Sequence, residues 1–172
     1  ALELTSRATF AAQQVNAPES LYRWEWQTGR LLKQVGTIDD AIGAYRRAVR
    51  TLQSIRPELS VSYGSSLPSF RETMGPAYFE LVDLLLQRAA SLKDPERAGP
   101  FLIEAREAVE LFKAAELRDY FRDDCVYTAL SKVTKLDVLA QTALVIYPII
   151  LPDRIELLVS LPTGLKRHLV PV

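Results

Sequence analysis

The most constraining feature of this sequence is a pair of helix-period segments that a single glycine separates. Pro18 suits the first position of a helix, and the segment that it opens runs to Val35, where Gly36 is a typical stop. Thr37 can cap the next segment, which continues to about Ile55. Because the connection is so short, we expect the two helices to lie antiparallel as a hairpin. The apolar residues of the second segment recur at helical spacing: Ile38, Ala41, Ile42, Tyr45, Ala48, Val49 and Leu52.

Three further helices are predicted in the first two thirds of the chain. Residues 2–15 place Leu4, Ala8, Ala11, Ala12 and Val15 on one helical face. A fourth helix is expected from near Ser69 or from Pro76 to about Leu92. A fifth is expected from Asp94-Pro95 to near Arg118, with Pro100 bending it or delaying its start. Residues 56–68 combine Pro, Ser and Gly without a sustained period, which predicts a loop between hairpins.

The C-terminal part has a different pattern. Residues 143–151, 154–161 and 165–172 are rich in Val, Ile and Leu and are separated by Pro-Asp and Pro-Thr-Gly, which predicts an antiparallel meander. The segment 122–140 has only a weak helical pattern. We therefore expect a mainly α protein, with a helical domain over 1–121, a connecting segment over 122–142 and strands over 143–172.

Composition excludes several classes of function. Lys plus Arg and Asp plus Glu both total 21, so no field of one sign attracts nucleic acid or an anionic membrane. The apolar runs are too short to span a bilayer. One Cys and one His cannot form the usual zinc ligand sets, so neither a metal nor another cofactor is expected. We expect a cytoplasmic location, and the missing initiator Met suggests an excised segment, which leaves export of the parent protein open.

The stretch GRLLKQVGTIDDAIGAYRRA resembles the tetratricopeptide (TPR) repeat, with Gly29, Leu32, Gly36, Ala41, Tyr45 and Ala48 at matching positions. The resemblance implies that small residues let paired helices approach closely while an aromatic ring fills the gap. Ala98, Leu102 and Ala105 repeat the pattern more faintly. The sequence departs from the family where Glu25 replaces the early Trp, where Lys93 replaces a turn Gly, and where the closing Pro is displaced to Pro57.

The segments AELRDYFRDDCV and ALVIYPIILPDRIELLVSLPTGLKRHLVPV are similar to the junction at which TPR repeats lead into a CHAT domain. CHAT proteins are caspase-like cysteine peptidases or pseudo-peptidases. The resemblance covers roughly the last third of the chain and implies that the strands begin such a domain, with its catalytic residues outside this chain. The order and the His-Gly context of the family's dyad are not found here.

The candidate site is a stripe on the helix 18–35. Arg23, Trp26, Arg30 and Lys33 follow one another at i, i+3, i+7 and i+10, so they share one face. The opposite face is expected to pack through Leu21, Thr28, Leu31 and Leu32. By resemblance to TPR proteins, the stripe lines a concave groove at positions that contact a bound peptide. Trp offers a rigid contact and Arg offers bidentate hydrogen bonds, which suit an acidic segment or a chain terminus.

An alternative interpretation of the stripe stays open. The facing helix carries Glu80, Asp83 and Gln87 at the corresponding positions, so ion pairs across the groove can neutralise the stripe internally. Exposed pairs contribute only about 0 to 1 kcal/mol, which a ligand carboxylate can displace. Charge reversal at Arg30 and Lys33 is expected to abolish binding if the groove is the site.

Catalysis within this chain is not expected. Cys125 and His168 are the one possible nucleophile and base, but Asp123 and Asp124 beside the thiol would raise its pKa, and His168 falls within a predicted strand. Adjacent carboxylates such as Asp39-Asp40 point about 100° apart on a helix and do not converge. That pair is better suited to the start of a helix, and Asp123-Asp124 to a helix end.

The function predicted from sequence is therefore a non-catalytic scaffold that recruits a protein or peptide. A first alternative is the regulatory part of a caspase-like peptidase. A second is a homodimerisation module, because an unpaired edge of the C-terminal strands can pair with another copy, unless Pro148, Pro152 and Pro171 blunt it.

Overall fold

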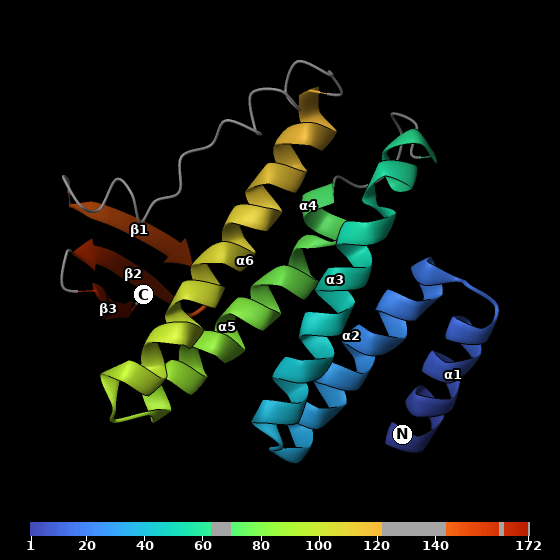
Figure 1. Ribbon diagram of the computed structural model, residues 1–172, viewed down its shortest axis with the longest axis horizontal. Helices are drawn as coiled ribbons and strands as arrows, with labels where there is room; N and C mark the ends of the chain where they lie inside the picture. Colours follow the sequence, from blue (N-terminus) through green and yellow to red (C-terminus); the bar gives the residue numbers. More distant parts are fainter. Residues whose placement is uncertain (63–69, 122–143, 162–163, 172) are drawn as a thin grey trace. The chain divides into compact units, whose positions relative to one another are not determined.

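The computed structural model describes residues 1–62, 70–121, 144–161 and 164–171, and the side chains of all of these except 56–62 and 118–121. These residues form six helices and three strands (Figure 1). The prediction of a mainly α protein with a small C-terminal antiparallel sheet is confirmed. The segment 122–140, Cys125 and Asp123-Asp124 lie outside the described residues.

The chain divides into two compact units, Ala1–Leu84 and Leu85–Val172. This division falls within a helix and differs from the predicted boundary after residue 121. The reason lies in α6 (Pro95–Phe121), whose side chains contact the strands, as described below.

The predicted hairpin is present as α2 (Pro18–Val35) and α3 (Ile38–Ser62), which pack against each other. Pro18 occupies the start of α2, and Gly36 ends it with a left-handed backbone at φ 89°. The Gly36 and Thr37 amides donate to the carbonyl oxygens of Lys33 and Leu32, each at 3.1 Å. The Thr37 hydroxyl also donates to the Leu32 carbonyl oxygen, at 3.3 Å, so its side chain helps to close α2 rather than to cap α3 as predicted.

The close contact between these helices is at Gly29. A Cβ atom placed on Gly29 would lie 2.7 Å from Cδ2 of Tyr45, which means that the aromatic ring lies against the α2 backbone. Tyr45 and its neighbours Ala41 and Ala48 are completely buried. Small residues on α2 and α3 thus allow the two helices to approach closely, and the ring of Tyr45 fills the space between them.

The predicted bounds of the fourth and fifth helices are close to those of the structure, whereas the end of the third helix needs correction. Helix α3 continues through residues 56–62, where a loop was expected, because a proline such as Pro57 removes one hydrogen bond without having to end a helix. The fourth helix is preceded by one separate turn, α4 (Phe70–Thr73), and α5 starts at Gly75 and ends at Ser91. Helix α6 starts at Pro95 without delay, passes through Pro100 and ends beyond Arg118.

Helix α1 (Leu2–Gln14) packs against α2 and buries only part of the predicted apolar face. Thr5 and Ala12 are its buried residues. Leu4 is 68% exposed and Val15 is 73% exposed. The helix itself is present as predicted, and helical spacing identifies a shared face without showing how much of that face is covered.

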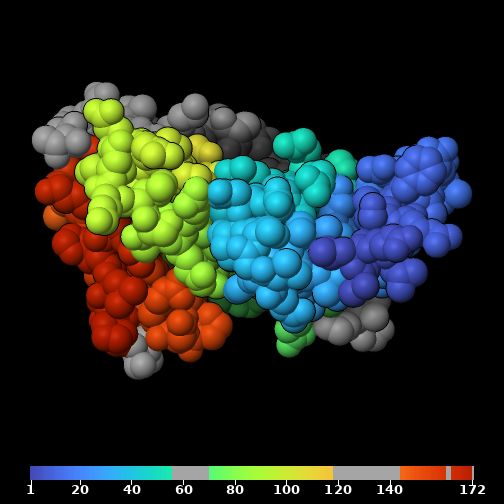
Figure 2. Space-filling view, turned by 90° about the horizontal axis from the view of Figure 1, so that it is seen from below, coloured from blue at the N-terminus to red at the C-terminus, as the bar shows by residue number. Residues whose placement is uncertain are grey.

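In the second unit the strands β1 (Val145–Ile150), β2 (Arg154–Leu161) and β3 (Gly164–Pro171) form an antiparallel sheet in the order β1-β2-β3. The predicted meander is confirmed, with its first strand shortened at both ends. Side chains of β2 alternate between buried and half-buried positions, so one face of the sheet is covered. Figure 2 shows the orange and red strands beside the yellow-green start of α6.

Helix α6 contacts the covered face through polar groups as well as apolar ones. The Arg106 guanidinium donates to the Ser160 hydroxyl at 3.4 Å, and the Tyr147 hydroxyl donates to the carboxylate of Glu110. Lys113 lies over the ring of Tyr147, with Nζ 4.3 Å from the ring centroid. Burial and the Glu110 carboxylate raise the pKa of Tyr147, which keeps its hydroxyl a donor.

In the described parts of the chain, every helix is either too short or too polar to cross a lipid bilayer.

Candidate interaction surface on helix α2

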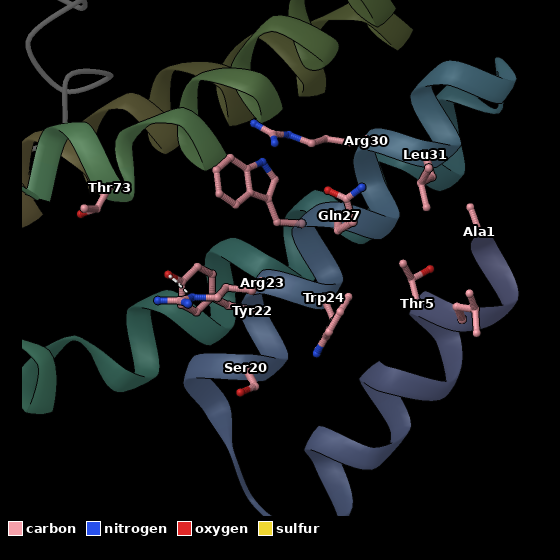
Figure 3. A pocket seen from close by; sticks show the side chains of 12 residues that line it. Ala1, Thr5, Ser20, Tyr22, Arg23, Trp24, Gln27, Arg30, Leu31 and Thr73 are labelled. Carbon is pink, nitrogen blue, oxygen red and sulfur yellow. Dashed lines mark hydrogen bonds between the residues drawn. The ribbon is translucent and has the colours of Figure 1, made fainter.

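A hollow of about 860 Å³ lies over α2 within the first unit, and we call it the α2 hollow. Helices α1, α2 and α4 contribute its walls (Figure 3). Two of its lining residues are basic and none is acidic. The lining consists of Ala1, Leu4, Thr5, Ser20, Tyr22, Arg23, Trp24, Trp26, Gln27, Arg30, Leu31 and Thr73.

The predicted stripe enters this hollow only in part. Arg23, Trp26 and Arg30 line it, whereas Lys33 does not. Arg23 and Arg30 are exposed, and Trp26 is half-buried. The Arg23 Nε donates to the Tyr22 hydroxyl at 3.3 Å, as the dashed line in Figure 3 marks.

Glu80 on α5 binds the two central residues of the stripe, Trp26 and Arg30. Its Oε2 accepts hydrogen bonds from Trp26 Nε1 at 2.8 Å, from Arg30 Nε at 3.1 Å and from the Tyr45 hydroxyl at 2.6 Å. Its Oε1 accepts from Arg30 Nη2 at 2.6 Å. The Arg30 guanidinium also stacks on Trp26, with its carbon 4.1 Å from the ring centroid. One carboxylate therefore ties α2, α3 and α5 together.

The electrostatics of this cluster keep Glu80 ionised. Burial raises the pKa of Glu80, but the hydrogen bonds from Arg30, Tyr45 and Trp26 together bring it below its usual value. The hydrogen bond to Glu80 raises the pKa of Arg30. Burial, followed by the Glu80 carboxylate, raises the pKa of Tyr45. Each pKa shift favours the protonation state in which these hydrogen bonds form, with Glu80 ionised and with Arg30 and Tyr45 protonated.

A second pair follows one turn later. Lys33 Nζ lies 3.2 Å from Asp83 Oδ2, with the lysine side chain 40% exposed. The ion pairs that the alternative interpretation predicted are thus present at Glu80 and Asp83. Gln87 is an exposed residue of α5 in the second unit.

The packing face of α2 differs from the predicted one. Its buried residues are Tyr22, Glu25 and Gly29, which face α3, whereas Leu21 and Leu31 are only half-buried. Glu25 is 4% exposed, accepts a hydrogen bond from the Thr51 hydroxyl at 2.8 Å and has Arg47 Nε at 3.9 Å. The prediction failed because it followed hydrophobicity, while the contact with α3 selects small size at Gly29 and tolerates a hydrogen-bonded carboxylate.

Sequence reasoning missed most of the residues that line the hollow. Trp24, Gln27 and Leu31 line it, together with Thr73 of the unpredicted turn α4. Leu31 is predicted to lie on the packed face, and helical spacing places Trp24 outside the predicted stripe. The signal available in the sequence was the presence of Trp24 close to Trp26, because large aromatic residues are enriched at interfaces.

Of the residues considered for catalysis, His168 and Asp39-Asp40 lie in the described parts of the chain, whereas Cys125 does not. His168 is exposed in β3, where its Cα pairs with that of Leu157. Asp39 and Asp40 lie in the first turn of α3, as predicted. Within the described ranges no cluster of His, Cys, Asp and Glu side chains is arranged to hold a metal ion.

Comparison with known proteins finds no matching family model, no matching curated protein and no matching solved structure.

Proposed function

We propose that this chain is a non-catalytic protein-interaction module of the TPR kind, which holds an extended segment of a partner polypeptide in the α2 hollow. The observation that carries the proposal is the lining of that hollow, which contains the basic side chains of Arg23 and Arg30 and no acidic side chain. Carboxylate groups of a partner suit such a lining, because Arg forms strong charge-assisted hydrogen bonds with them.

The TPR part of the proposal is supported by the contact between α2 and α3. Gly29 lies against Tyr45, and Ala41 and Ala48 are buried beside it, which matches the pattern of small and aromatic residues in the repeat. The stripe of α2 lies beside this contact, because Trp26 and Arg30 bind the same Glu80 carboxylate as Tyr45. A hairpin of this kind leaves one face of its first helix available to a ligand.

The two arginines do not contribute equally. Glu80 already accepts two hydrogen bonds from Arg30, so the charge of Arg30 is largely compensated within the protein. Arg23 is the other basic residue of the lining, and its Nε donates to the Tyr22 hydroxyl. We therefore expect modest affinity that depends on Arg23 and falls with rising salt concentration.

The test measures fluorescence anisotropy of fluorescein-labelled decapeptides, one rich in Glu, one rich in Lys and one neutral. The acidic peptide should bind, and Arg23→Glu should weaken it by roughly tenfold or more, as reversal of a charge facing a ligand carboxylate does. Arg7→Glu is the matched control, because Arg7 is exposed on α1 outside the hollow. Equal binding of all three peptides, or equal losses in both variants, would argue against the hollow as the site.

A catalytic role is tested with a thiol-reactive peptidase probe on the whole chain. In the alternative that draws on the CHAT resemblance, this module regulates a caspase-like peptidase domain of the same protein, and the chain itself carries no activity. We expect no probe labelling that depends on His168. Labelling that disappears in His168→Ala would contradict the non-catalytic proposal.

A second candidate function is self-association through the C-terminal strands. It is favoured by the outer face of β1, where Ile146 is 55% exposed and Ile150 is 72% exposed. Sedimentation equilibrium at increasing protein concentration tests it. If the molecular mass remains that of one chain at high concentration, self-association through the strands is excluded.

A further inference from the structure

The two faces of strand β2 differ in polarity in an unusual way. Its buried positions, on the face that α6 contacts, are mostly polar: Arg154, Glu156, Leu158 and Ser160. The positions between them are all aliphatic and only half-buried: Ile155, Leu157, Val159 and Leu161. An antiparallel sheet with one solvated face normally directs its apolar residues to the core and its polar residues to water. Here the aliphatic residues lie on the face that is directed away from the core.

This aliphatic face continues on both neighbouring strands, because residues opposite each other in an antiparallel pair share a face of the sheet. Three rows cross the sheet from β1 through β2 to β3, and they are Ile150-Ile155-Val170, Pro148-Leu157-His168 and Ile146-Val159-Lys166. We call the residues of these rows the outer sheet face. Its flanks are open to solvent, since Ile146 is 55% exposed, Ile150 72% and Val170 42%.

The size of the outer sheet face limits what can cover it. Strands about 4.8 Å apart and rows about 6.8 Å apart give three strands and three rows a footprint of roughly 300 Å². A stable dimer buries about 800 Å² on each partner, so this face falls short of what holds two copies together. A helix of about 14 residues is about 21 Å long and about 10 Å wide, which fits the footprint. A helix packed on a sheet is also a standard pair of layers.

Charge at the edge of the outer sheet face selects the partner further. Lys166 and His168 are exposed on β3, and neither forms an ion pair within the described parts of the chain. The rows contain no acidic residue. If two copies packed face to face, β3 of one would lie over β3 or β1 of the other. The first arrangement brings like charges together, and the second covers Lys166 with apolar side chains. A helix with acidic residues on the flank above β3 avoids both costs.

We propose that the outer sheet face binds an amphipathic helix of a partner protein, whose aliphatic stripe covers β1 and β2 and whose acidic flank faces Lys166. His168 can donate a hydrogen bond to the same flank. This inference goes beyond the proposed function, because it assigns a second interaction surface in which the α2 hollow takes no part. The small footprint implies weak, transient binding.

The test compares three fluorescein-labelled eighteen-residue peptides by fluorescence anisotropy with the whole chain. The first has Leu and Ile at helical spacing and Glu along one flank of that stripe. The second has Lys in place of each Glu, and the third has the residues of the first in an order that removes the stripe. The Glu-flanked peptide should bind roughly tenfold more tightly than the other two, because it alone matches both the apolar surface and the charge. Equal binding of all three would overturn the proposal.

Substitutions in the sheet test which residues make the contact. Ile150→Glu should weaken the Glu-flanked peptide roughly tenfold or more, because it places a charge within the apolar contact. Ile146→Glu repeats the test at the other end of the face. Leu111→Glu is the matched control, because Leu111 is 46% exposed on α6 and is not part of the outer sheet face. Equal losses in the control and in the sheet variants would contradict the assignment. Circular dichroism verifies that each variant is folded.

Lys166→Glu tests the role of charge. It should reverse the preference, so that the Lys-flanked peptide binds more tightly than the Glu-flanked one. A merely structural role of Lys166 would change the affinity of both peptides alike. A preference that stays with the Glu-flanked peptide would therefore show that Lys166 does not face the partner.

The position of the bound peptide is measured by NMR of the ¹⁵N-labelled chain. Amide shifts should change in β1, β2 and β3 and stay unchanged in α2, and Arg23→Glu should leave the affinity unaltered. This separates the inference from the proposed function, which depends on Arg23. Shifts confined to α2 would overturn it. Sedimentation equilibrium of the chain alone tests the other occupant: self-association that Ile150→Glu abolishes would show that a second copy covers the face and would overturn the proposal.

Discussion

The aromatic ring of Tyr45 lies against the backbone of Gly29, where a Cβ atom would be only 2.7 Å from Cδ2 of the ring. Tyr45 cannot move aside easily, because it is fully buried and its hydroxyl donates to Glu80 at 2.6 Å. The distance between α2 and α3 is therefore limited by the side chain at position 29.

Gly29→Ala is predicted to destabilise the protein by about 1–3 kcal/mol, the usual cost of overpacking a well-packed contact. Gly43→Ala is the control, since a Cβ there meets nothing closer than Arg47 Nη1 at 3.8 Å. That substitution should stabilise α3 by about 0.5–1 kcal/mol, because Ala favours a helix. Urea denaturation measures both, and a stabilised Gly29→Ala would show that the close contact is not obligatory.

The contact between Gly29 and Tyr45 belongs to the part of the fold that could be predicted from the sequence. Helical spacing, Pro18 and Gly36 are local signals, and they were sufficient to predict α2, the turn and the start of α3. The stripe of Arg23, Trp26 and Arg30 was found in the same way, because residues on one helical face can be listed from spacing alone.

The part that could not be predicted depends on contacts between distant residues. The sequence marks Glu80 only as one of several charges, yet α2 and α3 both direct hydrogen-bond donors to it. Trp24 and Leu31 form a wall of the hollow only because α1 and α2 meet there, and the turn α4 is too short to leave a periodic pattern. Glu25 was seen as a departure from a family pattern, although Thr51 gives its carboxylate a buried partner.

Glu80→Gln is predicted to destabilise the first unit by about 1–2 kcal/mol at neutral pH, a value reduced from that of fully buried charged hydrogen bonds because Glu80 is partly exposed. The pKa of Glu80 is lowered in the folded state, so its ionised form stabilises the protein above the unfolded pKa of about 4.5. This contribution is lost as pH falls through the folded pKa. Thermal unfolding below pH 4.5 should therefore be less pH-dependent in Glu80→Gln, and an unchanged slope would contradict the cluster.

Glu25→Gln should have the opposite effect. Burial raises the pKa of Glu25 above 4.5, so its ionised form costs stability above the folded pKa, and that cost disappears as pH falls towards 4.5. Gln keeps an acceptor for Thr51 without a buried charge, and we expect a gain of about 1 kcal/mol at pH 7. The gain should vanish below pH 4.5, as thermal melts across this range can measure. A loss of stability at pH 7 would mean that the pairing with Arg47 outweighs the cost of burial.

The inner face of the sheet contains a buried ionic cluster around Glu156, which is 0% exposed. Its carboxylate accepts a hydrogen bond from Arg154 Nε at 2.8 Å and two from Arg167, from Nε at 2.7 Å and from Nη2 at 2.6 Å. Both guanidinium groups are thus directed at one carboxylate between β2 and β3.

Glu156→Gln is predicted to destabilise the second unit by about 3–5 kcal/mol, because it removes the counter-charge of the mostly buried Arg167 guanidinium and one of the carboxylates that pair with Arg154, which also binds Asp153. Lys166→Gln on the neighbouring β3 position is the control, since Lys166 is exposed and its loss should change stability by less than about 0.5 kcal/mol. Hydrogen exchange of the backbone amides in β2 and β3 locates the effect: protection should fall in these strands and stay unchanged in α2. If protection in the strands were retained, the ion pairs would contribute nothing to the sheet, and its stability would have to come from the apolar contacts of Leu158 and Ile149 alone.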